Sequence, residues 1–251
     1  MSKINFEGKT FIVAGAGGIG AATAIALNEY GAKIIVLDIN EKGINELMPK
    51  LQGENASYVC DFSDVESIEA LVKTIVKEQG AIDGLAFCVG VGMVRPIKMS
   101  KYEFMKKVMD INYFSFVELI RCISGKNCYG TDGCTIVGIS ALGAYLGNST
   151  KTAYCASKAA MNSAVRCLAK ELAPKGFRIN TVAPGVTDTP MARAAEDYGS
   201  DSDEHKAILQ RQYLGICQPE DIANSVVYLM SDLAKKVTGS CIAVDGGKLS
   251  S

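Results

Sequence analysis

Short apolar runs alternate with longer segments along most of the chain. The runs have the length of β-strands and lie at residues 10–14, 33–37, 57–60, 84–89, 134–139, 178–182 and 239–244. Between most of them the apolar residues recur at helical spacing, at residues 19–30, 41–51, 64–79, 102–124, 152–173 and 219–230. This pattern predicts strands and helices in alternation.

Strands that are apolar on both faces are typical of a parallel sheet covered by helices on each side. The sequence therefore predicts an α/β fold, with a doubly wound parallel sheet of about seven strands. No repeat or linker divides the chain, so we expect a single domain over residues 1–251. Residues 187–215 are polar and charged, and we interpret them as a helical insertion or lid over the substrate.

The charge balance argues against two classes of partner. Lys and Arg number 26 and Asp and Glu number 27, a net charge of −1. Without a basic field, we expect no nucleic-acid partner and no membrane partner. The uncharged stretch 11–27 contains a glycine cluster and is shorter than the ~20 residues that span a bilayer. We therefore expect a cytoplasmic protein without a secretory signal.

Histidine and cysteine usage limits the chemistry. The one histidine, His205, argues against a histidine-based triad or a multi-histidine metal site. The nine cysteines form no Cys-x-x-Cys pair, which argues against a zinc ribbon or a thioredoxin-type site. We expect no metal, and we interpret the cysteines as small buried apolar residues in a reducing compartment.

A glycine-rich turn follows the first predicted strand and opens the first helix. It matches the G-x-G-x-x-G spacing, in the order Gly15, Gly17, Gly18, Ile19 and Gly20. Glycines allow the backbone to approach a pyrophosphate, whose charge a helix N-terminus stabilises. Between a strand and a helix this spacing predicts a dinucleotide site, although a tight turn between packed elements is an alternative.

Asp38 ends the second predicted strand. A carboxylate there can accept hydrogen bonds from the adenosine ribose and repel a 2′-phosphate. Residues 16–19 include no Arg or Lys to offset that repulsion. The sequence thus predicts NAD as cofactor, with NADP disfavoured. The alternative interpretation of Asp38 is a simple turn residue at the end of a strand.

Tyr154 and Lys158 are four residues apart, which makes them neighbours on one helical face. A nearby cation favours the phenolate, so such a pair can exchange a proton with a hydroxyl group. A second pair, Tyr102 and Lys106, has the same spacing within a lysine-rich helix, and we interpret it as solvated surface.

Ser140 follows the strand predicted at 134–139 and should face the same cleft as Tyr154. There it can hydrogen-bond a substrate oxygen, although it is also compatible with a simple turn. Because no histidine lies nearby to activate it, a hydrolase is disfavoured.

Together these residues resemble the short-chain dehydrogenase/reductase family along essentially the whole chain. The resemblance extends to Asp61, Asn112, Pro184, Gly185, Thr189 and the ending Asp-Gly-Gly at 245–247. It implies a Rossmann-like domain that binds NAD(P) and forms a homo-oligomer, a tetramer or a dimer.

The resemblance also implies a role for each matching residue. Tyr154 would be the general acid/base, and Lys158 would lower its pKa and bind the nicotinamide ribose. Ser140 would orient the substrate, and Asn112 would support a proton relay with Lys158. Asp61 would contact the adenine, and Gly90 would allow close approach to the cofactor. The remaining cofactor-binding residues would be Phe62 and, along the nicotinamide, Pro184, Gly185, Val186 and Thr189.

Three departures from the family pattern stand out. Ala14 replaces a threonine before a glycine loop that is one residue shorter. The family's Asn-Asn-Ala-Gly is here Phe-Cys-Val-Gly at 87–90. The interval from Ser140 to Tyr154 is one residue longer than is common. None of these changes removes a reacting group.

The residues expected near the nicotinamide lack charge, and most are apolar: Val91, Met93, Ala141, Leu142, Tyr145, Leu146, Val186 and Met191. They favour a hydrophobic secondary alcohol or ketone, and parts of the chain weakly resemble bacterial hydroxysteroid dehydrogenases. A 3-oxoacyl reductase and a polyol dehydrogenase remain open. The altered motif at 87–90 also leaves open an NAD(H)-binding sensor or scaffold without turnover.

Overall fold

The computed structural model describes residues 4–194 and 210–250. They include a seven-stranded sheet in the order β3-β2-β1-β4-β5-β6-β7, in which every neighbouring pair is parallel. The strands are β1 (Thr10–Ala14), β2 (Lys33–Asp38), β3 (Ala56–Val59), β4 (Gly84–Phe87), β5 (Thr135–Ile139), β6 (Arg178–Pro184) and β7 (Cys241–Val244). The predicted doubly wound fold is confirmed, and its strand order reverses between β1 and β4.

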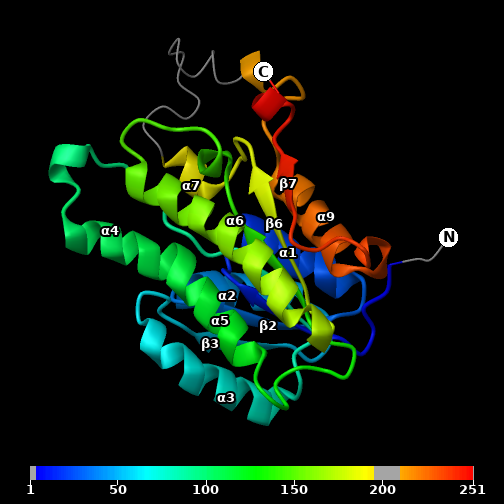
Figure 1. The fold of residues 1–251 in the computed structure, drawn as a ribbon. Coiled ribbons are helices and arrows are strands. Elements are labelled where there is room, and N and C mark those ends of the chain that lie inside the picture. Colours follow the sequence, from blue (N-terminus) through cyan, green and yellow to red (C-terminus); the bar gives the residue numbers. More distant parts are fainter. Residues whose placement is uncertain (1–3, 195–209, 251) are drawn as a thin grey trace.

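Helices cover both faces of the sheet (Figure 1). One core cluster packs the sheet against α3 (Ile68–Gln79), α5 (Ser115–Ile123) and α6 (Thr152–Leu172). The other packs it against α1 (Ile19–Glu29), α2 (Glu41–Leu47) and α9 (Pro219–Met230). Alternate residues of β1 enter opposite clusters, Ile12 one and Val13 the other, as the two-residue period of a strand requires.

Three predicted helices differ from the structure. The one expected over 64–79 begins with a 3₁₀ turn at Val65–Ser67, and its α-helical part is α3. The helix expected over 102–124 consists of α4 (Tyr102–Met109) and α5, joined by a π-helical turn at Asp110–Phe114. The helix expected over 41–51 ends at Leu47, and a 3₁₀ turn follows at Met48–Lys50. Pro49 explains this end, because it has no N–H with which to continue the α-helical hydrogen bonds.

The predicted lid is described only in part. Its first turn is α7 (Pro190–Arg193), and residues 195–209, including His205, lie outside the described residues. Over the rest of the chain, none of the helices is both long and apolar enough to cross a membrane.

The interpretation of the cysteines is only partly correct. All nine are free, but only Cys60, Cys122, Cys134 and Cys217 are buried. Cys167 is exposed, because it lies on the outer face of α6.

Candidate active site

Ser140 lies at the carboxyl edge of the sheet, directly after β5. Its backbone N–H donates to the carbonyl oxygen of Val182 at 2.7 Å, which continues the pairing of β5 with β6. The side chain is buried, and its Oγ lies 3.4 Å from the carbonyl oxygen of Lys158. The serine is thereby fixed against α6, the helix that carries Tyr154 and Lys158.

Tyr154 and Lys158 occupy the first two turns of α6, beside this strand end. The Nζ of Lys158 donates to the carbonyl oxygen of Ile139 at 2.7 Å, and the side chain is buried. It lies 6.0 Å from the centre of the Tyr154 ring. The structure thus brings together the hydroxyl, the phenol and the ammonium that the sequence analysis selected.

The pKa values of Tyr154 and Lys158 depart from their ordinary values in opposite directions. Burial, with a smaller contribution from Cys155, raises the pKa of Tyr154 to about 12. Burial lowers the pKa of Lys158 to about 8. The net rise comes from burial and Cys155, and the expectation that Lys158 lowers the pKa of Tyr154 stays a prediction. At neutral pH the phenol is therefore protonated and suited to donate a proton.

Asn112 lies in the π-helical turn, with its side chain buried. Its Oδ1 accepts from the N–H of Val91 at 2.8 Å, and its Nδ2 donates to the carbonyl oxygen of Val91 at 3.2 Å. Nδ2 also donates to Ser157 Oγ at 3.0 Å, which in turn donates to the carbonyl oxygen of Tyr154. The asparagine thus links the loop after β4 to α6.

Gly90 provides the space between these groups. A Cβ at this position would lie 3.1 Å from Lys158 Nζ and 3.5 Å from Asn112 Oδ1. The two residues assigned to the relay therefore flank the same glycine. Sequence reasoning missed Ser157, because nothing in the local sequence distinguishes it from an ordinary helix serine.

The glycine-rich turn lies at the carboxyl end of β1. Gly18 is the N-cap of α1 with φ 47°, no side chain caps the helix, and its first turn has no acidic residue. A Cβ at Gly20 would overlap the carbonyl oxygen of Gly15, whereas one at Gly17 would meet no atom within 4 Å. Ile19 begins the helix. Uncapped N–H groups beside open space fit a pyrophosphate.

Asp38 closes this turn. Its Oδ2 accepts from the N–H of Ala16 at 2.6 Å, and its Oδ1 accepts from the N–H of Asn40 at 2.8 Å. A carboxylate has about four acceptor sites, so both oxygens can accept further hydrogen bonds from a ribose. Asp38 therefore also anchors the loop, a role that the sequence did not indicate.

The other residues expected near the adenine differ in accessibility. Asp61 is exposed, and its Oδ1 accepts from the N–H and the hydroxyl of Ser63. Phe62 is buried and packs edge-on against Phe87, with ring centres 5.8 Å apart. The Phe62 ring belongs to the core, so only its backbone is left to face a ligand.

The segment from Pro184 to Thr189 crosses toward the glycine turn. The N–H of Gly185 donates to the carbonyl oxygen of Val244, and Thr189 Oγ1 caps α7 by accepting from Ala192. A Cβ at Gly18 would lie 3.1 Å from the methyl group of Thr189. The expected nicotinamide segment and pyrophosphate loop thus adjoin.

We call the residues expected near the nicotinamide the substrate rim. Two of them, Met191 and Tyr145, lie in different places. Met191 is exposed, and its Sδ lies 3.6 Å from where a Cβ of Gly92 would be, so it spans the loops after β4 and β6. Tyr145 is 51% exposed, and burial, with a smaller contribution from Cys241 at the start of β7, raises its pKa to about 12. The expectation that Tyr145 lines the nicotinamide region stays a prediction.

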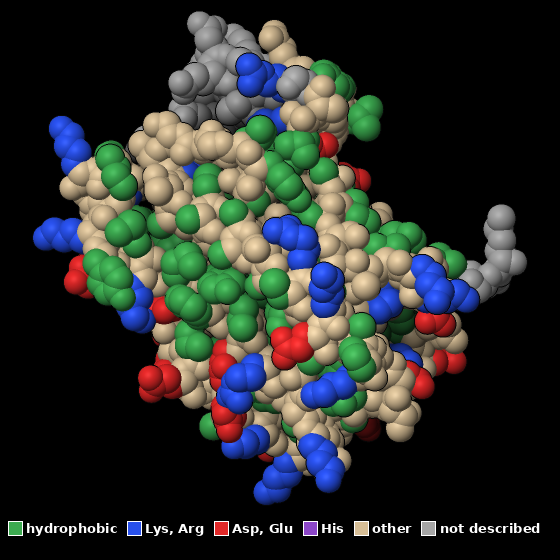
Figure 2. Space-filling model, viewed as in Figure 1, with side chains coloured by type: hydrophobic (Ala, Val, Ile, Leu, Met, Phe, Trp, Pro, Cys, Tyr) green, Lys and Arg blue, Asp and Glu red, His purple; other side chains and the backbone are tan. Residues whose placement is uncertain are grey.

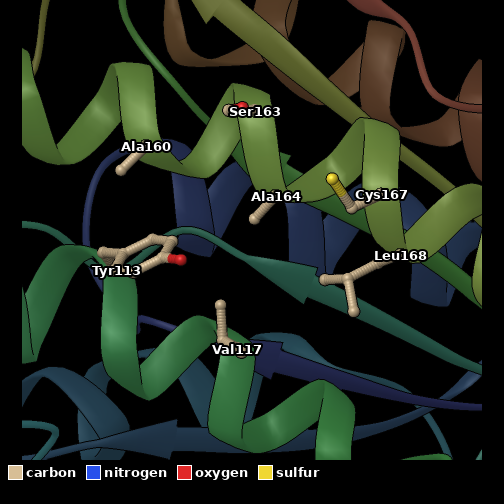
Figure 3. Close-up of a pocket in the computed structure, with 7 residues that line it drawn as sticks. All are labelled: Tyr113, Val117, Ala160, Ser163, Ala164, Cys167 and Leu168. Atoms are coloured by element: carbon tan, nitrogen blue, oxygen red, sulfur yellow. The ribbon is translucent and has the colours of Figure 1, made fainter.

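A separate groove of about 420 Å³ lies between α5 and α6 (Figure 3). It is lined by Tyr113, Val117, Ala160, Ser163, Ala164, Cys167 and Leu168. Figure 2 shows that apolar side chains gather on this face of the molecule. No residue predicted for the site takes part in it.

One group with spacing suited to a metal occurs among the described residues, formed by Glu69, Glu118 and Cys122. The guanidinium of Arg121 donates to both carboxylates. A cation of the chain itself therefore already neutralises this cluster.

Known proteins resemble this chain over nearly its whole length. A family model described as enoyl-(acyl carrier protein) reductase matches residues 13–248. A 3-oxoacyl-(acyl carrier protein) reductase of Thermotoga maritima is 30% identical, covering 97% of this chain and 99% of that protein. A 7alpha-hydroxysteroid dehydrogenase of Escherichia coli is 31% identical, covering 97% of this chain and 95% of that protein. A solved 7alpha-hydroxysteroid dehydrogenase in complex with NADH and 7-oxo glycochenodeoxycholic acid superposes with a TM-score of 0.90 at 29% identity, covering 98% of each chain.

Proposed function

The chain belongs to the short-chain dehydrogenase/reductase family, and from this premise we propose that it transfers a hydride between NAD(H) and a hydrophobic secondary alcohol or ketone. Oxidoreductases of this family act on carbinol and keto groups. The observation that carries the proposal is the convergence of Ser140, Tyr154 and Lys158 beside an uncapped helix N-terminus with a glycine turn.

Each side chain has one task in the proposed reduction. The bound cofactor supplies the hydride that the carbonyl carbon receives. Ser140 Oγ donates a hydrogen bond that orients the carbonyl oxygen, and Tyr154 Oη donates its proton to that oxygen. Burial raises the pKa of Tyr154, so the phenol carries this proton at neutral pH, as an ordinary tyrosine also does. Lys158 and Asn112, which meet at Gly90, return a proton from solvent to the phenolate.

Asp38 supports NAD as the cofactor. Its carboxylate lies beside the glycine turn, bonded to Ala16, where it would repel a 2′-phosphate. The related steroid enzyme with a solved structure was captured with NADH, which agrees with this choice.

The apolar character of Ala141, Leu142 and Met191 supports a hydrophobic substrate, and we place a hydroxysteroid first. The Escherichia coli relative supports this choice at 31% identity. A 3-oxoacyl group is the second candidate, equally supported by the Thermotoga maritima relative at 30%. Both present a ketone attached to a long apolar body.

The deciding experiment is a screen that follows nicotinamide absorbance with NAD(H) and with NADP(H). Three substrate classes are compared: an oxo-bile acid, a 3-oxoacyl thioester and a polyol. We expect the highest kcat/KM for the oxo-bile acid with NADH. A higher value for the thioester would replace the steroid by the fatty-acyl assignment. Tight NADH binding without turnover in any class would identify a sensor.

We also propose that the protein is a cytoplasmic homo-oligomer, a tetramer or a dimer. The resemblance to the family supports this, together with the near-neutral net charge of −1. Light scattering after size-exclusion chromatography measures the oligomer mass directly, and a monomer at micromolar concentration would exclude it.

A further inference from the structure

The side chain of Gln212 is 1% exposed and bonds both backbone groups of a single residue, Val186. Its Oε1 accepts from the N–H of Val186 at 2.9 Å, and its Nε2 donates to the carbonyl oxygen of Val186 at 3.0 Å. Nε2 also donates to the carbonyl oxygen of Gly215 at 2.6 Å. Every polar atom of this buried side chain is thus engaged.

Two glycines make room for this side chain. A Cβ at Gly185 would lie 2.6 Å from Gln212 Oε1, and one at Gly246 would lie 2.7 Å from Gln212 Cγ. The N–H of Leu214 donates to the carbonyl oxygen of Gly246 at 3.1 Å. The Asp-Gly-Gly sequence at 245–247 therefore has a packing role, because its first glycine admits Gln212 behind the strand ends.

Val186 is held from two directions. Besides Gln212, the N–H of Cys217 donates to the carbonyl oxygen of Val186 at 3.0 Å, and Thr187 pairs with Cys217. Without Gln212 the N–H of Val186 would lose its partner, and an unpaired buried donor is costly. The path of the backbone from Gly185 to Thr189 thus depends on one amide side chain.

We propose that Gln212 is a positioning residue for the nicotinamide end of the cofactor, acting through the backbone of Val186. The inference rests on the proposed function, in which residues 184–189 lie along the nicotinamide. It assigns to residues 212–217 the task of bracing that segment from behind.

A competing interpretation follows from chemistry. The Gln212 side chain and nicotinamide both carry a primary carboxamide, so Gln212 could instead occupy a place that the cofactor takes. The structure favours the brace, because displacing a side chain with four hydrogen bonds between two close-packed glycines would break all of them. The two interpretations predict opposite changes in affinity.

The test compares Gln212→Met with Gln52→Met, a control at an exposed glutamine whose side chain makes none of the described hydrogen bonds. Calorimetry measures the Kd of NADH and of ADP-ribose, which lacks the nicotinamide. We expect the Kd of NADH to rise about tenfold in Gln212→Met, the effect of losing one to two buried hydrogen bonds. The Kd of ADP-ribose should not change, and the control should change neither.

Hydrogen exchange without cofactor measures the brace independently. Gln212→Met should speed exchange of the amides in 184–189 by about tenfold, since one hydrogen bond is lost at Val186. Three results in Gln212→Met would overturn the proposal: unchanged exchange of these amides, tighter binding of NADH, or an equal loss of affinity for NADH and for ADP-ribose. Faster exchange with an unchanged Kd for NADH would overturn the positioning role alone. Absence of NADH and NADPH binding to the unmutated protein would overturn the proposed function as well.

A conservative variant gives a further readout. Gln212→Glu retains an acceptor for Val186 N–H but, when ionised, has no donor for Val186 C=O. Protonated, the carboxyl group offers one donor and one acceptor, which suffice for the two backbone groups of Val186 but leave the carbonyl oxygen of Gly215 without the amide's second donor. NADH affinity of this variant should therefore recover as the pH falls, while that of Gln212→Met should not. A loss of NADH affinity in Gln212→Glu that does not depend on pH would contradict the hydrogen-bonding role.

Discussion

The buried polar cluster at the end of β5 and the rim around it differ in how firmly their side chains are held. Asn112, Ser140 and Lys158 are 0%, 2% and 3% exposed, and each makes a hydrogen bond to the backbone of another segment. Met191 on the rim is 58% exposed, and its Sδ lies beside Gly92. Proton transfer requires fixed atoms, whereas apolar recognition tolerates movement. We therefore expect the cluster to set the reaction class and the rim to select the substrate.

Holding the cluster in place is costly. Lys158 carries a buried ammonium whose one described hydrogen bond is to a carbonyl oxygen, and burial lowers its pKa to about 8. A buried charge without a counterion destabilises a fold, as residues selected for activity often do. The rim carries no such penalty. The following predictions separate the two regions.

The largest effect is expected from Tyr154→Phe, which removes the proposed proton donor. Turnover should fall at least ~10²-fold, the range for loss of general acid catalysis, while NADH binding stays intact. Steady-state kinetics and calorimetry measure the two quantities. Tyr102→Phe is the matched control, since Tyr102 has a lysine at the same spacing but is exposed. Normal turnover of Tyr154→Phe would show that the proton moves elsewhere.

Lys158→Met should lower turnover about tenfold to a hundredfold by removing the group that returns the proton. Its stability should move in the opposite direction. At pH 7 the free energy of unfolding should rise by about 1–2 kcal/mol, because the variant has no buried ammonium. Urea denaturation measures this difference. Lys170→Met, at an exposed position of the same helix, should leave both properties unchanged.

The pH dependence of this difference has a definite sign. The pKa of Lys158 is about 8 in the folded chain and 10.5 as its ordinary value, so between these values the unfolded chain binds more protons. The unmutated protein should therefore gain stability as the pH rises from 8 toward 10.5. The advantage of Lys158→Met should shrink over the same interval. A constant difference would mean that the ammonium is not destabilising.

At Asp38 a smaller change is expected, in cofactor choice. Asp38→Ala should shift the kcat/KM ratio from NADH toward NADPH by about tenfold, equivalent to about 1.4 kcal/mol. Asp38→Asn separates the two roles of this side chain, because it keeps an acceptor for the N–H of Ala16 but removes the charge. If charge repulsion sets the preference, both variants should accept NADPH. Equal use of the two cofactors by the unmutated protein would contradict this role.

The smallest effect is expected on the rim. Met191→Ala should change the relative kcat/KM of long and short ketones by about threefold to tenfold, the effect of one to two methylene contacts. Stability and turnover of a small ketone should stay within error. Met99→Ala, at an exposed methionine away from Gly92, is the control. A large loss of turnover with every ketone would place Met191 in the reaction rather than on the rim.

Local features of the site were predictable from the sequence. The spacing of Tyr154 and Lys158 sets their common face because a helix repeats every 3.6 residues. The glycine turn could be assigned because its strand and helix adjoin it in sequence. The strand positions could be predicted from the apolar runs. The observed strand ends differ from the expected ones by at most two residues.

Features that depend on distant contacts were not predictable. Asn112 faces inward because a π-helical turn interrupts a helix whose apolar pattern reads as continuous. Tyr145 points toward Cys241, which is distant in sequence. Gln212 became significant only once folding placed it against Val186.

The sequence by itself determined the order of strands and helices and the family, and it predicted the reacting groups, because each depends on residue type and local spacing. Only the tertiary structure decided the protonation of the site and the support behind it. Whether a lysine lowers the pKa of a neighbouring tyrosine depends on how much water both have lost, and that is set by the packing of β5 against α6. The brace at Gln212 likewise exists only where three chain segments meet.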